Sequence, residues 1–136
     1  MPLKIVAKET LRVGQPLVVD ADSPDGRYAV VFEDDGDAGC FYAVDTDVED
    51  GNPVQDALLV YLAADVIDAD LASTLELGWS QDGLKALLLI NDVPHAAFDF
   101  GQRQGWCLSG LPEAAVNEAW SKAPRAWNEA VEALFE

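Results

Sequence analysis

The sequence predicts an α+β domain, mainly an antiparallel β-sheet of about six to eight strands with one or two C-terminal helices packed on it. Two observations lead to this fold class. Through most of the chain, short segments in which apolar and polar residues alternate are separated by Asp- and Gly-rich turns, which is typical of half-buried strands. Towards the C-terminus, the apolar spacing becomes that of a helix. A chain of 136 residues, 50% of them hydrophobic, suits a single domain over residues 1–136.

The first half of the chain predicts strands at residues 4–7, 17–20, 27–33, 39–45 and 57–64. The turn Ser-Pro-Asp-Gly at residues 23–26 precedes the third of these, and a loop rich in Asp and Gly at residues 34–39 joins the third to the fourth as a hairpin. The fifth is a continuous apolar run. Periodicity alone does not assign it, and we interpret it as a strand.

Residues 73–100 predict a three-stranded antiparallel meander. Alternation along the first strand ends at Asp82-Gly83, a dipeptide that favours a two-residue hairpin turn. The register set by this turn places three apolar pairs on one face: Trp79 with Ala86, Leu77 with Leu88, and Leu75 with Ile90. Residues 95–100 complete the meander.

Two helical segments follow the predicted sheet. Residues 112–120 begin with a proline and carry one apolar stripe, and in residues 127–135 the apolar spacing is i, i+3, i+4, i+7, i+8. The second face of the meander carries Leu87 and Leu89, so another layer should cover it. We expect the two helices to form that layer.

The charge of the chain is strongly negative and unevenly distributed. Asp and Glu number 25 against 8 Lys and Arg, which gives a formal net charge of −17. Most of the excess lies in residues 20–70, where Arg27 is the one basic residue. Such a surface repels phosphates, which excludes nucleic acid as a partner. It is either a solvated surface that maintains solubility or a docking surface for a basic protein.

The docking interpretation selects residues in two acidic loops and one aromatic residue. Carboxylates in flexible, solvated loops attract a basic partner, and a tryptophan between the last strand and the helices supplies an apolar anchor. The candidate partner-binding residues are Asp34, Asp35, Asp37, Asp47, Glu49, Asp50 and Trp106.

Catalytic, metal and cofactor sites are not indicated. The chain has one histidine, His95, and no nucleophile motif, so we expect no enzyme, no catalytic residues and no cofactor. Cys40 and Cys107 have no metal-binding spacing. Residues 45–56 approximate a calcium loop, but the glycine falls one place late and the last acid is Asp instead of Glu. We therefore assign no metal ligands.

The location follows from the lack of long apolar runs. No such run approaches the roughly 20 residues that a membrane span needs, and the first residues do not form a signal peptide. We expect a cytoplasmic protein with no membrane partner.

Two segments, residues 23–36 and 79–86, resemble a family of small acidic bacterial proteins catalogued as a domain of unknown function. The resemblance covers roughly residues 3–110 and implies a bacterial source and a compact, mostly β domain, with no activity to transfer. The chain is also similar in character to immunity proteins and antitoxins that occlude a basic partner such as a toxin, which is our leading hypothesis. The alternatives are a housekeeping adaptor or stand-alone domain, and a weak calcium-binding or enzymatic domain that uses the acidic loops.

Overall fold

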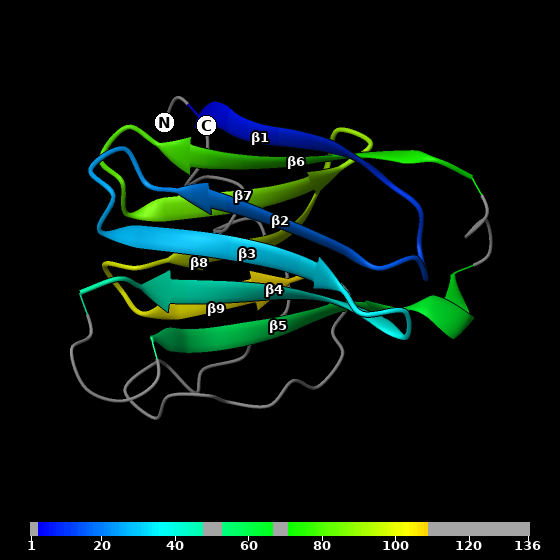
Figure 1. Cartoon of the computed structure of the whole chain (residues 1–136). Helices are drawn as coiled ribbons and strands as arrows, with labels where there is room; N and C mark the ends of the chain where they lie inside the picture. Colours follow the sequence, from blue (N-terminus) through cyan, green and yellow to red (C-terminus); the bar gives the residue numbers. More distant parts are fainter. Residues whose placement is uncertain (1–2, 48–52, 67–70, 109–136) are drawn as a thin grey trace.

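The computed structural model describes residues 3–47, 53–66 and 71–108, which form two antiparallel sheets packed face to face (Figure 1). The predicted α+β class is wrong for this part of the chain, where the only helix is the short 3₁₀ helix η1 (Ala63–Asp65). The layer that covers the inner face of each sheet is the other sheet. The two segments expected to be helical, residues 112–120 and 127–135, lie outside the described residues.

Each sheet contains a meander of four consecutive strands, and β1 (Leu3–Leu11) extends one of them beside β6 (Ser73–Ser80). One sheet has four strands in the order β2-β3-β4-β5, namely β2 (Leu17–Asp22), β3 (Tyr28–Asp34), β4 (Ala38–Asp45) and β5 (Val54–Leu62). The other has five strands in the order β1-β6-β7-β8-β9, namely β1 (Leu3–Leu11), β6 (Ser73–Ser80), β7 (Lys85–Ile90), β8 (Val93–Asp99) and β9 (Gln104–Cys107). The chain crosses between the sheets at residues 12–16, and again between β5 and β6.

The predicted meander is confirmed, with β6, β7 and β8 as its strands. Its register is the predicted one, pairing Trp79 with Ala86, Leu77 with Leu88, and Leu75 with Ile90. The predicted two-residue turn is wrong, because residues 81–84 connect β6 to β7. The strands expected in the first half of the chain are also present, with β1 and β2 longer than predicted. The sequence interpretation missed β9, a four-residue strand that pairs with β8.

The core lies between the sheets, where alternate residues of both meanders meet. Trp79, Phe32, Phe41 and Phe98 are each fully buried, and the rings of Phe41 and Phe98 stack across the interface with centroids 5.0 Å apart. The inner face of the four-stranded sheet is as apolar as that of the meander, so burying each against the other removes both from water. The other sheet therefore covers the face of the meander that carries Leu77 and Leu88, whereas the helical layer predicted over Leu87 and Leu89 falls on segments outside the described residues.

Both sheets contain the same turn. Ser23 Oγ donates to Asp25 Oδ1 (2.8 Å) in the β2–β3 turn, and Ser80 Oγ donates to Asp82 Oδ1 (2.5 Å) in the β6–β7 turn. Each turn then has a glycine with positive φ, +76° at Gly26 and +71° at Gly83. The sequence analysis did not identify this Ser-x-Asp-Gly repeat. The two turns that contain it lie at the same end of the sandwich (Figure 1).

Candidate protein-binding surface

The acidic residues proposed as one docking surface lie at opposite ends of the sandwich. Asp35 and Asp37 lie in the β3–β4 loop, whereas Asp47 follows β4. Because β4 is 8 residues long, its ends are about 25 Å apart. Figure 1 shows the β3–β4 loop and the C-terminal end of β4 at opposite ends of the strands. Glu49 and Asp50 lie outside the described residues. Alternation predicted β4, but it does not by itself show that the whole length of this strand separates the two loops.

Asp34 is buried, which contradicts its interpretation as a solvated docking residue. Its exposed fraction is 0%. Its Oδ2 accepts hydrogen bonds from Gly14 N (2.8 Å) and Tyr61 Oη (2.6 Å), and its Oδ1 accepts one from Gly36 N (2.8 Å). Burial, together with this hydrogen bond and the nearby charge, raises the pKa of Tyr61. Asp34 therefore links the β1–β2 turn, the β3–β4 loop and β5.

The other candidate carboxylates in the described loops are exposed, and two of them have hydrogen-bond or ion-pair partners. Asp35 Oδ1 accepts hydrogen bonds from Asp37 N (2.9 Å) and Ala38 N (3.0 Å), and these bonds hold the pKa of Asp35 below its usual value. Asp47 is 67% exposed, and its Oδ2 lies 3.7 Å from Arg27 Nε. Asp37 is exposed. These carboxylates can add to the negative field, but two of the three already have partners.

Trp106 is a strand residue and not part of a linker. It lies on β9 opposite Ala97, and it packs, half-buried, in a small apolar cluster with Leu87 and Leu89. This cluster is on the outer face of the five-stranded sheet. The anchor and the acidic loops that were expected to act together therefore belong to different parts of the molecule.

The outer face of the four-stranded sheet combines acidic and apolar side chains. The two rungs that cross it are Asp20–Val31–Tyr42–Ala57 and Val18–Glu33–Cys40–Leu59. The rung between them, Val19–Phe32–Phe41–Leu58, is buried in the core, so the first two face outward. We call the eight residues of these two rungs the acidic outer face.

The acidic outer face is accessible to a partner, and no base on its strands neutralises its carboxylates. Val18 is 63% exposed, Asp20 is exposed, and the other six residues are half-buried. The four strands contain no Lys, Arg or His, so no base on them neutralises Asp20 or Glu33. The pKa of Tyr42 is raised to about 12, first by burial of the hydroxyl and then by the neighbouring Cys40. At physiological pH the Tyr42 hydroxyl is neutral, as it would be with its ordinary pKa, and it lies in the middle of the face.

The other candidate chemistry finds little support in the described residues. Within them no three His, Cys, Asp or Glu side chains are grouped so as to hold a metal ion. His95 Nδ1 lies 2.7 Å from Val93 O, and Cys107 is buried with its Sγ 3.4 Å from Leu59 O. Among the same residues, no helix has the length and hydropathy that crossing a bilayer requires.

Comparison with known proteins extends the resemblance seen in the sequence. A family model described as an uncharacterized protein conserved in bacteria (DUF2251) matches residues 11–136. The match therefore includes the C-terminal segment that we had placed outside the resemblance. An uncharacterized protein of Haemophilus influenzae is 36% identical over 121 residues, which cover 88% of this chain and 74% of that protein. No solved structure matches the chain significantly.

Proposed function

This chain belongs to that bacterial family of uncharacterized proteins, and we propose that it is a binding protein whose acidic outer face engages a basic protein partner. The observation that carries the proposal is the composition of this face. Half-buried apolar side chains lie beside Asp20 and Glu33, and the four strands beneath contain no base. Protein interfaces likewise combine apolar side chains that lose water with polar and charged side chains that stay partly solvated.

The two components of the face have different roles in this proposal. The carboxylates, with the field of a chain of net charge −17, raise the rate at which a basic surface is encountered. Val31 and Tyr42 supply area that loses water on contact, and the neutral Tyr42 hydroxyl can donate or accept a hydrogen bond. Affinity then depends on the apolar side chains, whereas the choice of a basic partner depends on the carboxylates.

A protein with this surface is suited to occlude a basic cleft. That is the role of an immunity protein or antitoxin, which we propose as the functional class, with a basic toxin as the kind of partner and the cytoplasm as its place of action. The proposal includes no catalytic step and no cofactor. Binding through a sheet face needs neither.

The test compares two pairs of substitutions that remove equal charge. The outer-face variant is Asp20→Asn with Glu33→Gln, and the loop control is Asp35→Asn with Asp37→Asn. Partners captured from the source bacterium are identified by mass spectrometry, and their association rates with purified protein are measured. We expect a basic partner, several-fold slower association for the outer-face variant, and a smaller change for the loop control.

Salt provides the second measurement. The Debye length falls from about 8 Å at physiological ionic strength to about 3 Å at 1 M, so the association rate of the unmodified protein should drop steeply over this range. A partner that is acidic or neutral would contradict the proposal. So would equal effects of the two variants, or a rate that does not respond to salt. Equal effects would mean that the charge of the outer face has no special role, and a rate indifferent to salt would mean that the charge serves solubility alone.

A further inference from the structure

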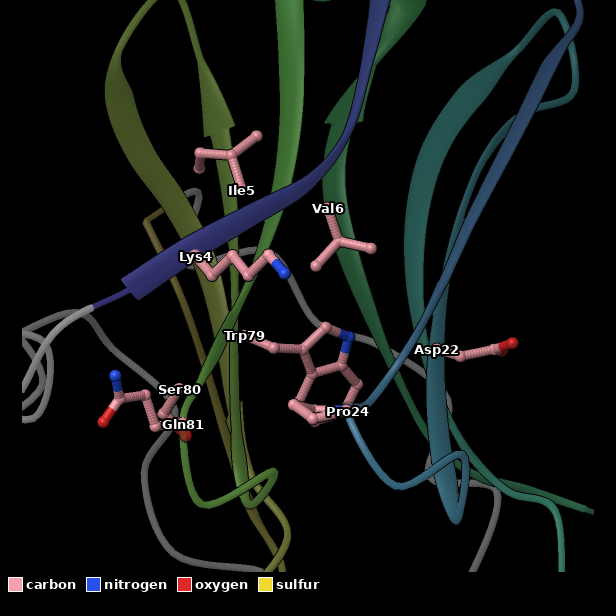
Figure 2. Close-up of a pocket in the computed structure, with 8 residues that line it drawn as sticks. All are labelled: Lys4, Ile5, Val6, Asp22, Pro24, Trp79, Ser80 and Gln81. Carbon is pink, nitrogen blue, oxygen red and sulfur yellow. The ribbon is translucent and has the colours of Figure 1, made fainter.

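A pocket opens between the two sheets at the edge where β1 and β2 lie near each other (Figure 2). Its volume is about 470 Å³, and its lining comes from the start of β1, the end of β2 and the end of β6. Small-molecule sites in proteins typically have volumes of about 300–1,000 Å³ and mostly apolar walls. The pocket is therefore large enough for a small ligand.

A β-bulge shapes one wall of the pocket. The register of β1 against β6 shifts between Ile5 and Ala7, which leaves Val6 without a partner in the ladder. Val6 is 46% exposed and points into the opening in Figure 2. Pro24, which follows β2, also lines the pocket. Without the bulge, alternation would return the next side chain to the outer surface.

Trp79 closes the inner end of the pocket. Its Nε1 donates a hydrogen bond to Ala21 O at 3.1 Å, which joins β6 to β2 across the core. The indole is fully buried and its one donor is satisfied. A ligand would therefore contact Val6 and Pro24, with the indole as a rigid base beneath.

The two charged side chains that line the pocket point in different directions. Figure 2 shows the Lys4 side chain extending across the opening towards Val6, whereas the Asp22 carboxylate points away. Lys4 is exposed and makes no ion pair with any residue that the structure describes. Lys8 lies on the same strand and Arg12 follows its end, against one carboxylate on the strand, Glu9.

From this arrangement we infer that the pocket binds an amphipathic carboxylate, with its apolar tail against Val6 and Pro24 and its carboxylate beside the Lys4 ammonium. An apolar wall combined with one unpaired cation selects a ligand with an apolar body and a single negative charge. The site lies at the β1–β2 edge and not on the acidic outer face, and it does not depend on the proposed function. The competing explanation is that the bulge and Lys4 only prevent β1 from pairing with another chain.

Octanoate is a suitable probe because its tail is apolar and its single charge is negative. Octanamide and octylamine serve as neutral and positive controls of the same tail length. Calorimetric titration into the full chain at low ionic strength measures affinity, and amide chemical shifts locate the site. We expect octanoate to bind more tightly than both controls and to shift the amides of Val6 and Ser80.

Two exposed lysines of the same strand provide matched variants. Lys4→Gln should weaken octanoate binding about threefold to fivefold, because an exposed ion pair contributes at most about 1 kcal/mol. Lys8→Gln removes the same charge outside the pocket and should change binding by less than about 1.5-fold. Absence of octanoate binding, tighter binding of octylamine, or equal effects of the two variants would each overturn the inference. The edge would then serve only to block strand pairing.

Discussion

Replacing Asp34 with Asn should destabilise the fold, although it exchanges only one oxygen for an NH2 group. The carboxylate Oδ2 accepts hydrogen bonds from Gly14 N and Tyr61 Oη, and Oδ1 accepts one from Gly36 N. An Asn side chain has one acceptor oxygen, so whichever way it is oriented its amino group faces at least one of these donors. At 0% exposure, one lost bond plus one unpaired buried donor costs about 2–4 kcal/mol.

Urea denaturation monitored by circular dichroism measures this cost, and thermal unfolding gives an independent value. For a chain of this size, about 2–4 kcal/mol corresponds to a fall in melting temperature of roughly 5–15 °C. The control is Asp35→Asn, because both backbone bonds of Asp35 end on its Oδ1, which an Asn oxygen can replace. We expect no measurable shift for it.

Tyr61→Phe separates the hydroxyl from the rest of this network. It removes one of the three bonds to Asp34 and should cost about 1–2 kcal/mol, less than Asp34→Asn. If Asp34→Asn unfolds at the same urea concentration as Asp35→Asn, the carboxylate does not hold the three segments together. The cost assigned to the buried, unpaired donor would then be wrong.

Two further predictions concern a glycine of β4 and the β6–β7 turn. Gly39→Ala should lower the urea midpoint at least as much as Tyr61→Phe, because the new Cβ would lie 2.5 Å from Cζ of the Tyr61 ring and would displace the hydroxyl from Asp34. An unchanged midpoint would mean that the ring has room to move. The hydrogen bond from Ser80 is the largest cause that holds the pKa of Asp82 below 3.8. This stabilisation is present above pH 4 and is lost as pH falls through the lowered pKa. Ser80→Ala should therefore raise the pKa of Asp82 in a carboxyl NMR titration, and an unchanged titration curve would refute this assignment.

Local rules predicted the hairpins well because each hairpin is determined by residues close in sequence. Asp82-Gly83 supplies the positive φ that the turn needs, and alternation around it fixes which side chains face inward. The pairing of β1 with β6 and the closure of two sheets depend on residues more than sixty positions apart. No local pattern encodes such contacts, which is why the fold class was wrong while the meander was correct.

β9 was missed for a related reason. Gly105 lies in the middle of its four residues, where a strand pattern would place an apolar side chain. The ring of Phe98 occupies the space beside it, since a Cβ at Gly105 would lie 2.9 Å from Phe98 Cδ1. The glycine is thus required by a contact with the neighbouring strand, and it hides the strand from an interpretation based on alternation.

The acidic loops were misinterpreted because an Asp in a loop can serve the backbone as well as solvent. Asp34, Asp35 and Asp82 each accept backbone N–H groups, so their negative charge is already used to hold turns in shape. Asp20 and Glu33 accept no hydrogen bond among those identified in the described part of the chain, and they lie on strands that need no carboxylate to form. A charge that the fold does not use for its own hydrogen bonds is the one left for a partner or for solubility. For this reason the outer-face variant, and not the loop variant, distinguishes these two roles.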